Sequence, residues 1–308
     1  MNPVNEQAMI DAINTMKKEK NAVILAHYYQ DGVIQDLADF TGDSYKLSVI
    51  AANTDADMIV FCGVHFMAET AKILSPDKTV LLPAIDAGCP MADMFTAEKL
   101  SEYKTNNPER KIVCYVNSTA EVKALSDVCV TSSNAEKIIK HFKDNPIMYV
   151  PDKNLGTYLK DKHSLDLDVW PGFCCIHNNL TKALVEDMSK KYPGAELIVH
   201  PEAPLEVVKM ASFAGSTKGL LEYVQNSDQS TFLIGTEKGI IHQMKKAAPE
   251  KAFIPLTEDL LCKNMKKITL KKLYESLKDT KYEINVPKDI AKDAKKALDK
   301  MIELSEAS

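Results

Sequence analysis

Three cysteines occur at nearly even intervals, and each ends a stretch that begins with a short apolar run. Cys89 and Cys174 are 85 residues apart (174 − 89), and Cys174 and Cys262 are 88 apart (262 − 174). The three stretches read TVLLPAIDAGC, LDLDVWPGFC and KAFIPLTEDLLC. Thiols at equivalent ends of three copies of one unit would meet at a pseudo-threefold axis, where they could bind a metal. The spacing therefore predicts a three-cysteine metal site.

A second set of polar residues repeats in the same register. The strand-like runs AVILAHYY, KIVCYVN and AELIVHPE carry residues spaced by 88 and 85 positions (115 − 27 and 200 − 115), which are His27, Tyr115 and His200. Seventeen positions after each of them comes a hydroxyl, at Ser44, Ser132 and Thr217. The same strand ends also carry Tyr29, Asn117 and Glu202. Histidine, tyrosine and glutamate are the side chains that move protons in catalysis, so this register predicts an active site.

The elements that position these residues are short strands alternating with helices. Each copy is expected to hold three strand–helix steps, with ADMIVFCG, PIMYVPD and STFLIGTE as the second strands and the cysteine-bearing runs as the third. Short apolar strands that alternate with helices are typical of parallel sheets covered on both faces. The predicted fold is α/β, with three similar αβα domains related by pseudo-threefold symmetry around a central active-site cavity. An ordinary doubly wound domain is the alternative.

The repeat gives boundaries for the three units. The first is residues 1–88 together with 265–308, the second is 89–173, and the third is 174–264. A last helix is expected after Pro287, with one apolar face made of Ile290, Ala294, Ala297, Met301 and Leu304. We expect this helix to pack on the first unit, near the N-terminal helix.

Strand ends and helix starts define the expected cavity. In open parallel sheets, ligands bind outside the carboxyl ends of the strands. The segments GDSYK, TSSNAEK and GSTKG look like helix starts, and Ser133 and Glu136 have the spacing of a capping box. Free backbone N–H groups beside a hydroxyl suit a carboxylate or phosphate, although a lone serine or threonine there is more often a structural cap.

The seven cysteines divide into two groups. Cys62, Cys114 and Cys129 lie in apolar runs and are expected to be small core residues. The three evenly spaced cysteines lie in turns and are better ligands. A 4Fe–4S cluster normally takes four cysteines, so three would leave one iron open as a Lewis acid suited to dehydration. A Cys3His zinc site completed by His177 is the alternative.

Composition limits the classes of function. The 308 residues are 45% hydrophobic with a net charge of −5, so neither a basic face nor a nucleic-acid motif is apparent. The longest uncharged stretch, 58–68, is shorter than the roughly 18 residues that span a membrane. An odd cysteine count without a signal peptide indicates reduced thiols and a cytoplasmic location. Twelve lysines between 263 and 300 alternate with acidic residues and indicate a solvated face more than a polyanion site.

Over almost its whole length the chain resembles quinolinate synthase, the A protein of de novo NAD biosynthesis. The motifs that carry the resemblance are AHYYQ (26–30), TGDSYKLS (41–48), GVHFMAETAKILSP (63–76), AGCPMADM (87–94), YVNSTAEVKALSD (115–127), WPGFCCIH (170–177), HPEAP (200–204) and GSTKG (215–219). The resemblance implies a 4Fe–4S cluster with the three ligands Cys89, Cys174 and Cys262. It also implies condensation of iminoaspartate with dihydroxyacetone phosphate to quinolinate, with loss of phosphate and two waters.

The resemblance also implies roles for the polar residues. We expect Tyr29, His200 and Glu202 to transfer protons, with Tyr115 in the same neighbourhood. The residues expected to hold carboxylates or phosphate are Asn117, Ser132, His177, Ser216 and Thr217. Two further residues, His27 and Ser44, are expected to face the substrate.

The chain departs from the family pattern in two places. Cys174 and Cys175 are adjacent, and the pattern W-x-G-x-C-x-x-H selects Cys174, so Cys175 is expected to pack away from the site. Some relatives carry further cysteines before the third ligand, whereas Cys262 stands alone and gives no support for a redox switch there. The supplier of iminoaspartate, an aspartate oxidase or an aspartate dehydrogenase, stays open. A small-anion-binding protein and an iron–sulfur sensor are the competing functions.

Overall fold

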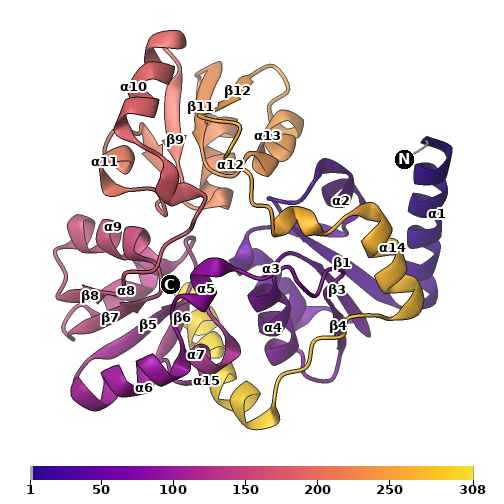
Figure 1. Ribbon diagram of the computed structural model, residues 1–308, viewed down its shortest axis with the longest axis horizontal. Coiled ribbons are helices and arrows are strands. Elements are labelled where there is room, and N and C mark those ends of the chain that lie inside the picture. The colour runs from indigo at the N-terminus through magenta and orange to yellow at the C-terminus, as the bar shows by residue number, and fades with distance from the viewer. Residues whose placement is uncertain (1–2, 308) are drawn as a thin grey trace.

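The computed structural model describes residues 3–307 and contains three parallel sheets of four strands each. Figure 1 shows three lobes, each with one sheet and its own helices, set around a common centre. The expectation of an α/β chain with three αβα units is confirmed. The sheets occupy residues 22–81, 111–169 and 196–255, so each lies inside one of the three predicted units. On that basis we propose the boundaries of the sheet-bearing segments, 1–88, 89–173 and 174–264, and the pseudo-threefold relation among the units.

The strand order is the same in all three sheets. The first sheet has the order β2-β1-β3-β4, with β1 (Ala22–His27), β2 (Phe40–Gly42), β3 (Met58–Cys62) and β4 (Thr79–Leu81). The second has the order β6-β5-β7-β8, with β5 (Lys111–Tyr115), β6 (Val128–Val130), β7 (Ile147–Val150) and β8 (Leu167–Val169). The third has the order β10-β9-β11-β12, with β9 (Glu196–Val199), β10 (Phe213–Ala214), β11 (Thr231–Gly235) and β12 (Ala252–Pro255).

Each unit has one strand more than predicted. The added strands are the edge strands β2, β6 and β10, which have three, three and two residues. Such short segments do not show the apolar run by which a buried strand is recognised. They nevertheless decide where the hydroxyls lie, because Ser44, Ser132 and Thr217 follow the ends of these three strands by two or three residues.

Helices cover both faces of each sheet. The first unit has α1 (Pro3–Glu19), α2 (Gly32–Leu37), α3 (Ser44–Asn53) and α4 (His65–Leu74). The second has α5 (Pro90–Asp93), α6 (Ala97–Asn106), α7 (Ala120–Ala124), α8 (Ala135–Ile139), the 3-10 turn η1 (Lys140–Phe142) and α9 (Lys153–His163). The third has η2 (His177–Asn179), α10 (Lys182–Lys191), α11 (Leu205–Val208), α12 (Thr217–Asn226), η3 (Lys238–Ile240) and α13 (Ile241–Ala247). Because both faces are covered, the strand interiors are buried almost throughout.

The C-terminal segment forms η4 (Met265–Lys267), α14 (Leu270–Asp279) and α15 (Lys288–Glu306). Helix α14 packs on α1, whereas α15 packs on α7, β6 and α8 of the second unit and on α4 of the first. The expectation that the last helix lies near the N-terminal helix is therefore wrong. Its apolar face was predicted correctly, since Ala294, Ala297, Met301 and Leu304 are buried. The pattern identifies an apolar face but not the surface that the face will cover.

A further repeated feature follows the cysteines. Seven residues after each one, a threonine accepts a hydrogen bond from a backbone N–H and caps the next helix. These caps are Thr96 on α6, Thr181 on α10 and Thr269 on α14. The N–H donors are those of Lys99, Leu184 and Lys272, at 3.5, 3.2 and 3.3 Å. The local structure after the thiols is thus repeated as well as their spacing. Within residues 3–307, no helix combines the length and apolar character needed to cross a membrane.

Candidate active site

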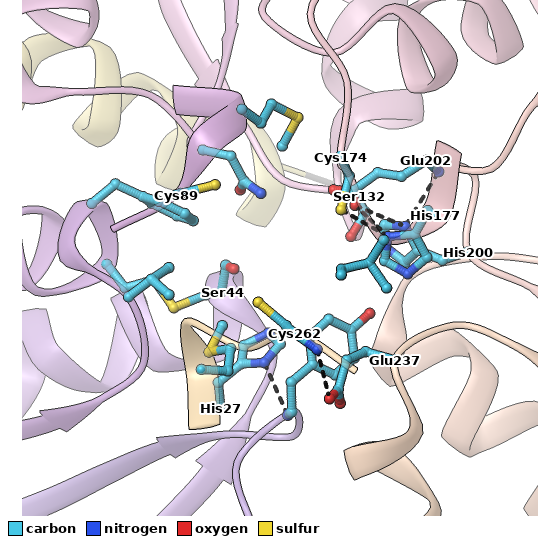
Figure 2. A pocket seen from close by; sticks show the side chains of 18 of the residues that line it. His27, Ser44, Cys89, Ser132, Cys174, His177, His200, Glu202, Glu237 and Cys262 are labelled. Atoms are coloured by element: carbon cyan, nitrogen blue, oxygen red, sulfur yellow. Dashed lines mark hydrogen bonds and ion pairs between the residues drawn. The ribbon is translucent and has the colours of Figure 1, made fainter. Parts of the chain in front are cut away.

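The carboxyl ends of the strands surround a pocket between the three units (Figure 2). It encloses about 730 Å³ including its open mouth, within the range usual for small-molecule sites. Of the fourteen residues predicted for the site, thirteen line this pocket: His27, Tyr29, Ser44, Cys89, Tyr115, Asn117, Ser132, Cys174, His177, His200, Glu202, Thr217 and Cys262. The fourteenth, Ser216, is the N-cap of α12, and its hydroxyl accepts the N–H of Gly219 at 3.1 Å.

Each of the three cysteines begins a short helical turn. The carbonyls of Cys89, Cys174 and Cys262 accept the N–H of the fourth residue on, at 3.3, 2.9 and 3.2 Å. Each sulfur also faces the N–H groups of the second and third residues that follow it. Figure 2 shows that the three thiols approach the pocket from different sides. Two N–H donors at each sulfur are an arrangement that favours thiolates over apolar thiols.

Burial opposes thiolate formation. It raises the pKa of Cys89 to about 12 and raises the pKa values of Cys174 and Cys262, although the backbone N–H groups counteract the shift. Without a cation the three sulfurs therefore stay protonated at neutral pH, and a bound metal would displace their protons. Three half-buried cysteines whose sulfurs face backbone N–H groups fit a metal centre held by thiolates. Hydrogen bonds to sulfur are also typical of iron–sulfur sites.

The other cysteines lie mainly where they were expected. Cys62, Cys114 and Cys129 are buried in strands, which confirms their assignment to the core. Cys175, however, is exposed and lies among the residues that line the pocket, so the expectation that it packs away is wrong. The sulfur of its neighbour Cys174 lies 3.2 Å from Nδ1 of His177. Sulfur, imidazole nitrogen and a carboxylate oxygen of Glu202 lie within 4.8 Å of one another, so this side of the pocket could also hold a metal ion.

Glu202 is the centre of a buried polar network. One carboxylate oxygen accepts the hydroxyl of Tyr115 at 2.6 Å, and the other lies 2.8 Å from Nδ1 of His177 and 3.8 Å from Nδ1 of His200. The rings of His177 and His200 stack with their centroids 5.0 Å apart. Tyr115 at the end of β5, His177 after β8 and His200 after β9 thus surround one carboxylate.

The surroundings fix the protonation states of this network. Burial by itself would raise the pKa of Glu202, but His200 and the hydrogen bonds from His177 and Tyr115 lower it below the ordinary value, so Glu202 is ionised. Burial lowers the pKa of His200 to about 4. Burial and the negative charge of Glu202 raise the pKa of Tyr115 well above its ordinary value. At neutral pH the site therefore offers a carboxylate, a neutral imidazole and a protonated phenol.

A second group of side chains lies on the first unit. The hydroxyl of Tyr29 lies 2.7 Å from that of Thr236, which in turn lies 2.9 Å from Nε2 of His177. His27 packs edge-to-face on Tyr29 at 4.6 Å between ring centroids. Burial and the proximity of His200 lower the pKa of His27 to about 3. Burial and the charge of Glu202 raise the pKa of Tyr29. Thr236 thus links the two groups, and sequence reasoning did not identify it.

Asn117 indicates where a ligand would bind. Its side-chain oxygen is buried and accepts no hydrogen bond from the described residues, although Asn117 lines the pocket. Buried polar atoms are normally hydrogen-bonded, so an unpaired acceptor at a pocket wall is typical of a site that pairs with its ligand.

The helix starts near the hydroxyls differ from the prediction in one unit. Ser44 and Thr217 are the first residues of α3 and α12, as expected. In the second unit α8 begins only after Asn134, so Ser132 lies in the preceding loop. The predicted capping box of Ser133 is wrong, because its hydroxyl donates instead to the carboxylate of Asp43. Asp43, which caps α3 through the N–H of Lys46 at 2.9 Å, also lines the pocket and was missed.

Two buried acids beside the cysteines were also missed. Asp152 and Glu237 follow β7 and β11 by two residues and are fully buried. With Val64 they occupy positions spaced by 88 and 85 residues (152 − 64 and 237 − 152), the register of His27, Tyr115 and His200. That register was the signal that could have identified them. Burial and the charge of Glu202 raise the pKa of Asp152, and burial raises that of Glu237 despite the nearby ammonium of Lys266.

The fold and the pocket define an α/β protein with an enzyme-like site, in which three cysteines and a buried network of ionisable side chains line one pocket. The sequence model of the family described as "Quinolinate synthetase A protein" matches residues 11–303. The chain is 49% identical to "Quinolinate synthase" of Alkaliphilus metalliredigens over 98% of this chain and all of that protein. It is 44% identical to "Quinolinate synthase 2" of Methanosarcina acetivorans over 98% of this chain and 97% of that one. The chain belongs to the quinolinate synthetase A family, and the resemblance seen in its motifs is confirmed.

Proposed function

We propose that this protein is a quinolinate synthase that condenses iminoaspartate with dihydroxyacetone phosphate and releases phosphate and two waters. The observation that carries the proposal is the convergence in one pocket of three cysteines, from the loops after β4, β8 and β12, and of the Glu202 network. Forming a pyridine ring requires a carbon–carbon bond, an isomerisation, an imine closure and dehydrations, and each step moves protons. The pocket supplies groups in the protonation states that these steps need.

The proposed metal group is one 4Fe–4S cluster held by Cys89, Cys174 and Cys262. When bound, it would supply an open iron that acts as a Lewis acid. The donor set fits this group, because the three cysteines line one pocket and each sulfur faces backbone N–H groups. The Cys3His alternative with His177 is less well supported, since Nδ1 of His177 already pairs with Glu202 at 2.8 Å.

The proton transfers are assigned from burial and contacts. Neutral His200, lying 3.8 Å from Glu202, is placed to accept a proton while the carboxylate stabilises the imidazolium. Tyr115 and Tyr29 keep their protons at neutral pH and act as donors toward developing oxyanions. Glu202 holds both Tyr115 and His177 in place, so its charge organises the whole group.

Anion binding is assigned to the strand ends and helix starts. Thr217 begins the ten-residue helix α12 and lines the pocket, so its hydroxyl and the first free N–H groups suit a carboxylate or phosphate. Ser44 at the start of α3 and Ser132 after β6 line other sides of the pocket. The free oxygen of Asn117 would accept a hydrogen bond from the substrate. Ser216 supports Thr217 by capping the same helix rather than by facing the pocket.

Location and partners follow from the same proposal. We propose a cytoplasmic enzyme, since all seven cysteines are unpaired. Its substrates are small molecules, and an aspartate oxidase or aspartate dehydrogenase is the proposed supplier of iminoaspartate.

Metal analysis and turnover test the proposal directly. Protein purified without oxygen is expected to be brown, to hold about four irons per chain and to form quinolinate from the two substrates. Zinc in place of iron would contradict the cluster. Iron-loaded protein that forms no quinolinate would contradict the activity.

A further inference from the structure

The loops of Cys174 and Cys262 each form a backbone hydrogen bond to a buried acidic side chain. The carboxylate of Asp152 accepts the backbone N–H of Cys174 at 3.2 Å, and that of Glu237 accepts the N–H of Cys262 at 3.2 Å. The second oxygen of each acid bonds its own turn, to the N–H of Leu155 at 2.6 Å and of Gly239 at 2.7 Å. Each acid thus joins the end of one strand to the loop that follows the next strand.

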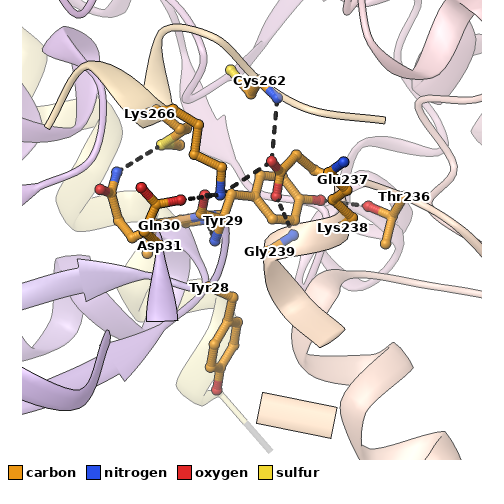
Figure 3. A network of polar contacts seen from close by, with 12 residues as sticks. Tyr28, Tyr29, Gln30, Asp31, Thr236, Glu237, Lys238, Gly239, Cys262 and Lys266 are labelled. Carbon is orange, nitrogen blue, oxygen red and sulfur yellow. Dashed lines mark hydrogen bonds and ion pairs between the residues drawn. The ribbon is translucent and has the colours of Figure 1, made fainter. Parts of the chain in front are cut away.

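The two acids are equivalent in the repeat. They lie 22 and 25 residues before their cysteines (174 − 152 and 262 − 237) and two residues beyond β7 and β11. Both are fully buried, although neither a carboxyl group nor its charge is favoured in such surroundings. Figure 3 shows Glu237 between the N–H groups of Cys262 and Gly239, with Lys266 beside it at 3.4 Å. Burying a carboxyl group in this way costs free energy, so its hydrogen bonds are expected to have a structural or functional role.

The loop of Cys89, after β4, has no acid at the equivalent position. Three residues beyond β3, β7 and β11, a backbone N–H donates to the carbonyl two positions before the cysteine: His65 to Ala87, Lys153 to Gly172 and Lys238 to Leu260, at 2.8, 2.7 and 2.8 Å. The position after β3 that corresponds to the two acids is Val64, and Cys89, in the loop after β4, is followed by Pro90, which fixes the backbone at the start of α5. The loops of Cys174 and Cys262 have no proline at that point and carry the acid bond instead.

Two glycines allow these close approaches. A Cβ at Gly172, two residues before Cys174, would lie 2.6 Å from the carbonyl oxygen of Pro151 at the end of β7. A Cβ at Gly239 would lie 2.7 Å from the carboxylate of Glu237. A Cβ at Gly172 would therefore push the Cys174 loop away from the end of β7, and one at Gly239 would displace the carboxylate of Glu237.

We propose that Asp152 and Glu237 are positioning residues that fix the loops of Cys174 and Cys262, respectively, so that both thiols are in place for the metal group. The role of the two acids in preparing a metal site rests on the proposed function, whereas their contacts with the cysteine loops do not. Small errors in ligand position lower metal affinity strongly, so loops that lack proline need such a bond. Cys89 is expected to depend on neither acid.

Alkylation of individual thiols tests the proposal. Every protein carries Cys175→Ser, so that alkylation of Cys174 is measured without a contribution from the neighbouring thiol. Metal is removed with a chelator under reducing conditions. Limited iodoacetamide is added, and peptide mass spectrometry follows Cys89, Cys174 and Cys262 over time. Asp152→Ser can still cap α9 through a short hydroxyl but cannot reach Cys174. Glu237→Ala removes the bond to Cys262.

The expected result is selective. Asp152→Ser speeds alkylation of Cys174 roughly fivefold or more, and Glu237→Ala does the same for Cys262, because one buried hydrogen bond is lost in each. The other two thiols keep their rates. Glu237→Gln, which retains an acceptor oxygen, returns Cys262 to its original rate. Thr181→Ala and Thr269→Ala are matched controls, since each removes a helix cap seven residues after the same cysteine.

Three outcomes would overturn the proposal. They are unchanged rates in both acid variants, equal acceleration of all three thiols, and acceleration by the cap controls as large as by the acid variants. In the protein as purified without oxygen, both acid variants should also release iron to a chelator faster than the Cys175→Ser parent, and equal release rates would contradict the purpose assigned to the acids. If the parent holds no iron, the proposed function fails while the alkylation pattern still decides the positioning role.

Discussion

Two buried histidines make the stability of the fold depend on pH. The ordinary pKa of 6.5 falls to about 3 in His27 and about 4 in His200, chiefly because both rings are buried. Below pH 6.5 the unfolded chain therefore binds protons that the folded chain does not. Stability is complete above the unfolded pKa and is lost as the pH falls toward the folded values. The two histidines thus contribute a loss of stability on acidification, and replacing one of them should remove its part of that loss.

The magnitude follows from the pKa values. Between about pH 7.5 and pH 5, protonation of one unfolded histidine lowers the free energy of unfolding by about 2 kcal/mol, at about 1.4 kcal/mol per pH unit below the unfolded pKa. The folded forms of His27 and His200 take up almost no proton in this interval. The pair together therefore accounts for about 4 kcal/mol, of the order of a quarter to three quarters of the stability of an ordinary domain.

Urea unfolding measures the effect. Metal-free, reduced protein is unfolded at both pH values, as the parent and as His27→Gln, and the loss of unfolding free energy is compared. The loss should be smaller by about 2 kcal/mol in His27→Gln. His141→Gln removes an exposed histidine and serves as the control. Equal losses in the parent and His27→Gln would refute the assignment of His27 as a buried neutral imidazole.

Three substitutions test the site. Cys174→Ala is expected to lose the iron while Cys175→Ala keeps it, as measured by iron content of protein purified without oxygen; the reverse result would reassign the ligand. Glu202→Gln should keep the iron but lower quinolinate formation at least about a hundredfold, because the charge that orders Tyr115 and His177 is gone; near-normal turnover would remove Glu202 from the mechanism. Gly172→Ala should lower the free energy of unfolding by about 1–3 kcal/mol through the clash with Pro151, and unchanged urea unfolding would show that the loop can shift freely.

The sequence was most informative where a register repeats. The register of the cysteines and of His27, Tyr115 and His200 identified twelve of the thirteen predicted residues that line the pocket, and the family pattern supplied His177. Spacing works here because equivalent positions in repeated units meet at equivalent strand ends, whatever the side chains are. The same register contained Asp152 and Glu237, which were overlooked because their local sequences, VPDKN and GTEKG, read as ordinary turns.

Other features depend on contacts between distant parts of the chain and could not be predicted from a local sequence pattern. The edge strands have only two or three residues, so their pairing depends on the neighbouring strand rather than on their own composition. Ser133 was read as a cap because of Glu136 nearby, but the carboxylate of Asp43, ninety residues away, takes its hydroxyl (133 − 43). Thr236 gave no signal because its task, joining Tyr29 to His177, exists only in the folded chain.

The position of α15 has a consequence for the order in which the chain can fold during synthesis. The second sheet is complete once residue 169 has been made, yet α7 and the edge strand β6 are covered by residues 288–306. On a ribosome that releases the chain from its N-terminus, this unit must wait for more than a hundred further residues before its apolar surface is closed. The first and second units are therefore expected to reach their final packing together, after the third has been synthesised, and to rely on chaperones in the interval more than their small size suggests.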